Sequence, residues 1–229
     1  MLISIMARKK KTKSVKSEDI VQDVSNKNET SLKEKSEDSE VLLENVEIKD
    51  ILAETNEVAD ANLEREIVIA DSTNLTRDLY DKTRYGEPTE NKSFQYSLIE
   101  GLYLLERGKF KIKSSNKVLD FDSYVKKARK IEPNFWVRYC VFKDLRKRGY
   151  IVKTALKFGA DFRVYDRGVK PGEDHAKWIV YPVSEGEQLG WYEFSAKNRV
   201  AHSTRKRLLV ACADVEGQIT YWEIRWIRP

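Results

Sequence analysis

A tyrosine, a histidine and a lysine stand in the last third of the sequence, at places where a fixed fold can present reactive side chains. Tyr165 ends the β-type run "DFRVY", the bend "DRGVKPG" follows, and His175 comes just before the run "KWIVYPV". Lys206 lies thirty-one residues further on, where a helical stretch meets the run "RLLVACAD". Strand ends beside Gly/Pro loops are favoured positions for reactive groups. A phenol, an imidazole and an ammonium group, without a carboxylate pair or metal-ligand spacing, indicate metal-free proton-transfer chemistry.

RNA cleavage is one reaction that these three groups could catalyse. RNA carries its own nucleophile, the 2′-hydroxyl, so an enzyme need only remove that proton, protonate the departing 5′-oxygen and stabilise charge on the phosphorane. His175 suits the acid role, because the ordinary pKa of an imidazole is ~6.5. Lys206 carries a compact positive charge that suits the non-bridging oxygens. A phenol, with an ordinary pKa of ~10, is a weak base, so Tyr165 either needs a cation such as Lys206 or Arg167 nearby or only orients the hydroxyl.

Two other classes of protein remain open at this point. A metal-dependent DNA nuclease of related topology needs clustered carboxylates and a lysine on a strand, in a PD…ExK pattern, and no convincing cluster of that kind is present. A non-catalytic RNA-binding or assembly subunit would have lost the tyrosine or the histidine, and both are present. Cys140 and Cys212 lie in apolar runs without a CxxC spacing, so we expect core thiols rather than a zinc site. We expect no metal and no cofactor.

The first 60 residues differ sharply in composition from the rest. They contain no aromatic residue and no glycine, so they bury too little apolar surface to offset chain entropy, and we predict a disordered charged tail. Their net charge is −4, which leaves +9 on residues 61–229 and favours an anionic partner such as nucleic acid. No apolar run approaches the roughly 18 residues of a membrane span, and the opening is too short for a secretory signal. We therefore expect a soluble cytoplasmic protein with no membrane partner, beginning at Met1 or Met6.

The sequence predicts an α+β fold in which residues 61–145 form a small α-rich N-terminal domain. One short strand is predicted at 65–70. Helical spacing and cap residues predict helices over 72–88, 93–110, 120–131 and 134–150. Asn134 is a candidate N-cap of the last helix. Its helically spaced apolar residues are predicted core, namely Phe135, Tyr139, Phe142 and Leu145.

Residues 146–229 are expected to form an α/β nuclease domain with a mixed central sheet. β-branched and aromatic runs, divided by Gly, Asp and Pro, predict strands at 150–158, 161–166, 177–183, 206–214 and 219–227. One helix is predicted over 193–207. Trp178 and Tyr181 are expected to fill the core of the sheet, whereas His202 is expected to pack or cap locally and Asp174 to be a solvated turn residue.

Several stretches together resemble the archaeal tRNA-splicing endonuclease (tRNA-intron lyase) family. "RVYDRGVKPGEDHAKWIVYPV" and "RVAHSTRKRLLVACAD" resemble the catalytic domain, and "SLIEGLYLLERGKF" and "IEPNFWVRYCVFKDLRKRGYIVKT" resemble the N-terminal domain and the domain junction. The resemblance covers roughly residues 65–229. It implies that Tyr165 is the general base, His175 the general acid and Lys206 the transition-state stabiliser. It further implies cleavage of precursor tRNA at a bulge–helix–bulge, leaving a 2′,3′-cyclic phosphate and a 5′-hydroxyl.

The same resemblance implies further residues for RNA binding and assembly. Two arginines of the family clamp a bulge base across a subunit interface, and Arg199 and Arg225 stand at the matching places. The family assembles as tetramers or pseudo-tetramers through an acidic loop, and Asp214 and Glu216 in "ADVEGQ" supply that loop here. We expect a homotetramer, and a heterotetramer with a non-catalytic partner stays open.

Overall fold

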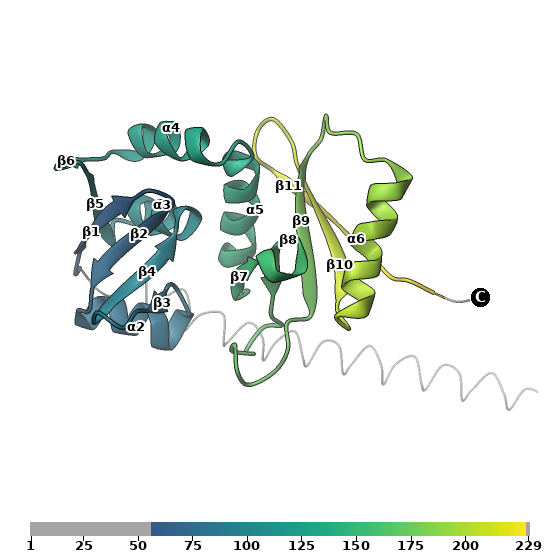
Figure 1. Ribbon diagram of the computed structural model, residues 1–229, viewed down its shortest axis with the longest axis horizontal. Coiled ribbons are helices and arrows are strands. Elements are labelled where there is room, and N and C mark those ends of the chain that lie inside the picture. Colours follow the sequence, from purple (N-terminus) through teal and green to yellow (C-terminus); the bar gives the residue numbers. More distant parts are fainter. Residues whose placement is uncertain (1–55, 228–229) are drawn as a thin grey trace, which may run out of the picture. The chain divides into compact units, whose positions relative to one another are not determined.

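The computed structural model describes residues 56–227, and the tail predicted to be disordered, residues 1–60, lies outside that range except for its last five residues. Within it, the chain forms two β-sheets with α-helices packed against them (Figure 1), which confirms the α+β fold class. No helix in this part of the chain is long and apolar enough to cross a membrane.

The N-terminal part of the described chain is built on a sheet. Its strands are β1 Ala59–Glu64, β2 Ile67–Asp71, β3 Glu87–Pro88, β4 Ser93–Ser97, β5 Phe110–Ser114 and β6 Lys117–Val118, in the spatial order β3-β4-β2-β1-β5-β6. β1 is parallel to β5, and the other neighbours are antiparallel. The prediction of an α-rich N-terminal domain was therefore wrong, because a mixed sheet forms its centre.

The predicted helix over 93–110 divides into a strand and a helix. Ser93–Ser97 pair with β2, with Phe94 and Tyr96 buried and Gln95 exposed. Helix α3, Leu98–Glu106, begins only after Ser97, whose hydroxyl accepts a hydrogen bond from the backbone N–H of Glu100 at 3.2 Å. The Glu100 carboxylate accepts the Ser97 N–H at 3.0 Å in return. This capping box fixes the start of the helix.

Helix α3 packs closely against strand β2 and helix α4, Phe121–Ile131. The remaining helices in the N-terminal half are α2 Asn74–Thr83 and α5 Phe135–Lys147. A Cβ on Gly101 of α3 would lie 2.7 Å from both Val68 Cγ2 and the Tyr124 hydroxyl, so the glycine permits the close contact of α3 with β2 and α4. The Tyr124 hydroxyl donates to the carbonyl of Leu98 at 2.9 Å, which joins α4 to α3.

Helix α5 joins the N-terminal elements to the second sheet. The predicted core residues Phe135, Tyr139, Phe142 and Leu145 are all buried, as expected, whereas Asn134 occupies the N-cap position without a side-chain cap hydrogen bond. The Arg146 guanidinium donates to the carbonyl of Thr83, the last residue of α2, at 2.7 Å. It also donates at 2.8 Å to the hydroxyl of Tyr85, which lies two residues beyond that helix.

The C-terminal sheet carries the predicted site residues at its strand ends. Its strands are β7 Val152–Ala155, β8 Ala160–Val164, β9 Trp178–Ser184, β10 Arg207–Ala213 and β11 Ile219–Ile224, in the order β11-β10-β9-β8-β7. β9 and β10 are parallel and the other pairs antiparallel, so the sheet is mixed, as predicted.

Two helices cover opposite faces of this sheet (Figure 1). On one face, Phe142 of α5 packs on Phe162 of β8 with ring centroids 6.1 Å apart. On the other face, Ala201 of α6, Trp191–Ser203, packs with Ile179 and Leu208. Because side chains alternate along a strand, successive residues at a strand end project toward α5 and α6 in turn.

Candidate active site

Three strand ends meet at one edge of the C-terminal sheet. Val164, the last residue of β8, pairs with Trp178, the first residue of β9, and Trp178 pairs in turn with Arg207, the first residue of β10. Two backbone hydrogen bonds extend this row, from the N–H of Lys177 to the Val164 carbonyl and from the N–H of Arg207 to the Lys177 carbonyl, each 2.9 Å long. Neighbouring strands lie about 4.8 Å apart, so the ends of β8 and β10 are separated by roughly 10 Å.

The three predicted catalytic residues flank this row. Tyr165 directly follows Val164, Lys206 directly precedes Arg207, and His175 precedes Trp178 by three residues. The topology therefore brings Tyr165 and Lys206, which are 41 positions apart in sequence, to a single end of the sheet. This proximity follows from β8 being antiparallel to β9 while β9 is parallel to β10.

Tyr165 is held firmly by its surroundings. It is 4% exposed and packs with Ile151, Val169 and Ala176. Its backbone N–H donates to the carbonyl of Ile151 at 3.0 Å. Val169 and Ala176 belong to the loop of residues 165–177 that also carries His175, so this loop packs against Tyr165.

Local contacts shape the loop that presents His175. Gly168 and Gly172 have φ values of 77° and 100°, a region that favours glycine. Lys177 forms an ion pair with Asp166, which joins the two ends of the loop. His175 is exposed, and its backbone N–H donates to the Asp174 carboxylate at 2.6 Å; Asp174 is an exposed turn residue, as predicted.

Lys206 is placed by the end of helix α6. Arg205 adopts a left-handed conformation with φ 55°, and the N–H of Lys206 donates to the Ala201 carbonyl at 2.8 Å, so the chain turns from the helix into β10. The Lys206 ammonium donates to the Thr204 carbonyl at 2.9 Å and lies 5.3 Å from the centre of the Phe158 ring. Burial, and then the positive charge of Arg163, lower the pKa of Lys206.

Arg163 is a cation of this site that the sequence reading missed. Its guanidinium carbon lies 5.9 Å from the centre of the Tyr165 ring, and its Nε is buried without a hydrogen-bond acceptor among residues 56–227. In the same range, neither Arg163 nor Lys206 forms an ion pair with a carboxylate. Arg167, one of the two cations considered from sequence, lies over the Tyr150 ring instead, at 5.0 Å. The two-residue period of strand β8 could have identified Arg163, because it projects to the same face as Tyr165.

The two predicted clamp arginines are both exposed. Arg199 lies on α6, one turn before the end of the helix, and its Nε donates to the Ser195 carbonyl at 3.4 Å. Arg225 follows Ile224 of β11, which pairs with Leu208 of β10, so it lies toward the sheet end that carries Lys206. Its Nε donates to Glu223 at 2.7 Å.

The predicted docking residues lie at the other end of the sheet. Asp214 and Glu216 stand in the turn between β10 and β11. The Asp214 carboxylate accepts the Gln218 N–H at 2.8 Å, and Gly217 takes a φ of 81°. The loop is therefore remote from Lys206 along β10 and does not belong to the catalytic cluster.

Other predictions for single residues have mixed outcomes. Tyr181 is buried as expected, whereas Trp178 is only half-buried, and His202 packs edge-on against Trp226 with ring centroids 4.1 Å apart. Cys140 is buried and Cys212 half-buried, and neither forms a disulfide. Across residues 56–227, no group of three or more His, Cys, Asp or Glu side chains is placed to hold a metal ion.

The fold is thus that of a two-sheet α+β protein with a candidate proton-transfer site at one end of its second sheet. Two family models match the chain: the tRNA intron endonuclease N-terminal domain over residues 59–125, and the tRNA intron endonuclease catalytic C-terminal domain over residues 135–221. The catalytic match begins at the first residue of α5. The chain belongs to the tRNA-splicing endonuclease family and contains that family's catalytic domain.

Curated relatives agree with these matches. The chain is 41% identical over 164 residues to the tRNA-splicing endonuclease of Methanothermobacter thermautotrophicus, an alignment that covers 72% of this chain and 95% of that protein. It is 46% identical over 138 residues to the enzyme of Nanoarchaeum equitans, covering 58% of this chain and 88% of that protein. The enzyme of Thermococcus onnurineus is 41% identical over 150 residues, covering 66% and 85% respectively.

Proposed function

We propose that the protein excises introns from precursor tRNA by cutting both exon–intron boundaries of a bulge–helix–bulge. Membership of the tRNA-splicing endonuclease family supports the substrate class. The observation that carries the chemistry is the row Val164–Trp178–Arg207, which sets the flanking residues Tyr165 and Lys206 at one sheet end. Bulged bases suit such an enzyme, because unstacked nucleotides are exposed and free to adopt in-line geometry.

In the proposed reaction, the ribose 2′-hydroxyl attacks the neighbouring phosphorus. Tyr165 enters the step as the phenolate and accepts the 2′-hydroxyl proton as the new P–O bond forms. The bond from phosphorus to the 5′-oxygen breaks, its electron pair stays on that oxygen, and His175 protonates it. The products are a 2′,3′-cyclic phosphate and a 5′-hydroxyl. General acid and base groups typically contribute ~10²–10⁴-fold each.

Two cations stabilise the phosphorane in this proposal. Arg163 and Lys206 have no carboxylate partner in the described chain, and burial and then the charge of Arg163 lower the pKa of Lys206. An anion between the Arg163 and Lys206 side chains would offset the repulsion between these two cations. We propose that the scissile phosphate is that anion. The Arg163 guanidinium also lies 5.9 Å from the centre of the Tyr165 ring, so a positive charge stands beside the phenol.

We propose that Arg199 and Arg225 of different subunits hold a bulge base between them. Both are exposed and belong to elements that end near Lys206. A guanidinium stacks on a planar base and keeps its charge at every relevant pH.

The clamp needs an assembly, and we propose a homotetramer. β11 is the edge strand of its sheet and exposes Trp222, which favours pairing with a second copy. Asp214 and Glu216 of the acidic loop are proposed to dock on a neighbouring subunit. The heterotetramer stays an alternative, and the predicted domain limits (1–60, 61–145, 146–229) and the cytoplasmic location stay predictions.

The test incubates the purified protein with a bulge–helix–bulge RNA in excess EDTA and analyses the RNA ends. Cleavage that leaves cyclic-phosphate and 5′-hydroxyl ends supports the proposal. Cleavage only with added magnesium points to a metal-dependent nuclease, and binding without cutting points to a non-catalytic subunit. Either of these two results contradicts the proposed chemistry.

A further inference from the structure

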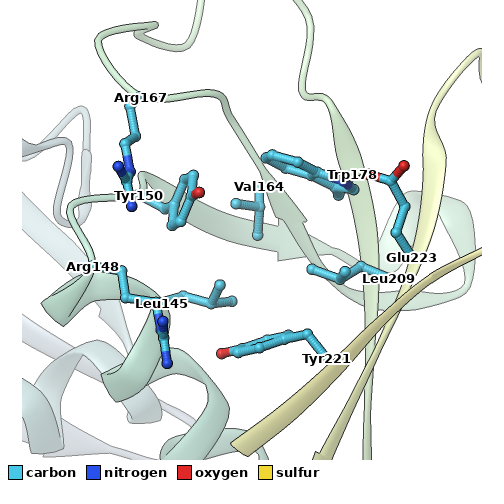
Figure 2. A pocket seen from close by; sticks show the side chains of 9 residues that line it. All are labelled: Leu145, Arg148, Tyr150, Val164, Arg167, Trp178, Leu209, Tyr221 and Glu223. Carbon is cyan, nitrogen blue, oxygen red and sulfur yellow. Dashed lines mark hydrogen bonds between the residues drawn. The ribbon is translucent and has the colours of Figure 1, made fainter. Parts of the chain in front are cut away.

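A pocket of about 220 Å³ lies beside the candidate active site, on the α5 side of the C-terminal sheet. Figure 2 shows Tyr150, Val164 and Trp178 along one side of it and the Tyr221 ring facing them from the other. The Tyr150 and Trp178 rings meet edge to face with centroids 5.7 Å apart. The pocket is smaller than the ~300–1,000 Å³ of most small-molecule sites, so it suits a single planar ring system.

Two arginines stand at one end of this pocket (Figure 2). The Arg167 guanidinium lies 5.0 Å from the centre of the Tyr150 ring, and the Arg148 guanidinium lies 5.7 Å from the centre of the Tyr221 ring. Arg148 is paired with Asp144. Arg167, however, has a buried Nε without an acceptor in the described part of the chain. Positive charge beside aromatic rings on which bases can stack is the usual composition of a site for single-stranded nucleic acid.

The pocket and the candidate active site share one sheet end. Val164 lines the pocket and immediately precedes Tyr165, and Trp178 lines the pocket three residues after His175. Successive residues project to opposite faces, so Val164 faces the pocket while Tyr165 projects to the other side. An RNA strand that crosses this sheet end therefore meets both sites within neighbouring nucleotides.

We propose that this pocket binds the base of a nucleotide adjacent to the scissile phosphate of the RNA substrate. The inference rests on the proposed function, because it needs the phosphate to lie near Tyr165 and Lys206. The base stacks against Tyr150, and Arg167 contacts the phosphate or sugar of the same nucleotide. This gives Arg167, two residues after Tyr165, a role outside proton transfer.

The far end of the pocket offers a hydrogen-bond acceptor to a base. Glu223 lines that end and accepts a hydrogen bond from the Trp178 indole N–H at 2.7 Å. Although burial raises the pKa of Glu223, hydrogen bonds from Trp178 and two arginines hold it at about 2, so the carboxylate is charged. Arg207 and Arg225 both pair with this carboxylate. Its oxygens accept hydrogen bonds, so they suit the N–H groups of a base.

The experiment places 2-aminopurine on the 5′ or the 3′ side of the scissile phosphate in a bulge–helix–bulge RNA. A 2′-deoxy substitution at the attacking ribose prevents cleavage. Full-length wild-type protein is expected to quench the emission at one of the two positions through stacking. Tyr150→Leu and Arg167→Gln are expected to abolish that quenching and to raise the dissociation constant by about 5- to 150-fold. Arg129→Gln is the matched control, since Arg129 lies 5.3 Å over the Trp136 ring away from this sheet end, and it should bind as the wild type does.

The outcomes separate the pocket from the proposed function. If the wild type cuts the all-ribose RNA but quenches neither probe position, or if both pocket variants bind like the wild type, the pocket does not hold a base. A changed solution mass of the pocket variants with unchanged RNA binding would show that a second copy occupies the pocket, and would also overturn the inference. Failure of the wild type to cut the all-ribose RNA contradicts the proposed function itself.

Discussion

Replacing Arg163 by glutamine tests the proposal that Arg163 and Lys206 together stabilise the charge of the phosphorane. The substitution keeps a polar side chain of similar length but removes the cation that lies 5.9 Å from the Tyr165 ring. Two unit charges about 5 Å apart at an effective dielectric constant of about 20 interact by ~3 kcal/mol. If Arg163 meets the phosphorane at that distance, the chemical step should slow by about 100-fold.

The assay is single-turnover cleavage with saturating protein across a range of pH. The proposed reaction uses the protonated form of Lys206, and burial and then the charge of Arg163 lower the pKa of this ammonium group. Wild-type activity should therefore decline as the pH rises through this lowered pKa. Arg163→Gln removes the second cause, so its alkaline decline should move to higher pH while its maximum rate falls.

If Arg163 only supported the fold, a different pattern of rates among its variants would be expected. Arg163→Lys restores a cation and should recover part of the rate, whereas a merely misfolded variant would not be rescued in this way. Arg107→Gln is the matched control, because Arg107 lies 5.3 Å over the Tyr103 ring in the N-terminal half. A wild-type rate and an unchanged alkaline limb in Arg163→Gln would refute the reasoning.

The remaining predictions concern substrate capture, assembly and packing. Arg199→Ala should weaken binding of the bulged RNA with little change in the melting temperature, and normal turnover on limiting substrate would argue against the clamp. Asp214→Ala combined with Glu216→Ala should lower the solution mass, measured by light scattering, from that of a tetramer; an unchanged mass would contradict the docking role. Gly101→Ala should destabilise the fold by about 1–3 kcal/mol in urea unfolding, because the new Cβ would lie 2.7 Å from Val68 Cγ2. Unaltered stability would mean that α3 can shift without cost.

The C-terminal sheet could largely be predicted from sequence, because its strands are strongly apolar and divided by Gly, Asp and Pro. Each predicted run there overlaps a strand of the structure. The N-terminal sheet could not be predicted in the same way. β1, "ADANLE", is a polar run that is placed by pairing with β2 and β5, and β4 adjoins α3 without a Gly or Pro between them. Pairing with neighbouring strands makes β1 and β4 strands, and the local sequence propensity of these segments does not predict that pairing.

The candidate site was predicted by residue type and spacing, but its geometry needs the strand register. Spacing alone does not reveal that Val164, Trp178 and Arg207 form one row. It also does not distinguish Arg163 from Arg167, since both lie two positions from Tyr165. The structure places Arg163 over the Tyr165 ring and Arg167 over the Tyr150 ring, because Arg163 lies within β8 and Arg167 lies in the loop beyond it.

The most direct measurement compares His175→Ala on two RNAs that differ only in the leaving atom at the splice site. A 5′-bridging sulfur leaves as a thiolate and needs no protonation, whereas the natural 5′-oxygen does. We predict that His175→Ala cuts the natural RNA at least ~100-fold more slowly than the wild type, yet cuts the sulfur-containing RNA at close to the wild-type rate. Equal impairment on both RNAs would contradict the assignment of His175 as the acid, and with it the proposed arrangement of phenol, imidazole and ammonium at this sheet end.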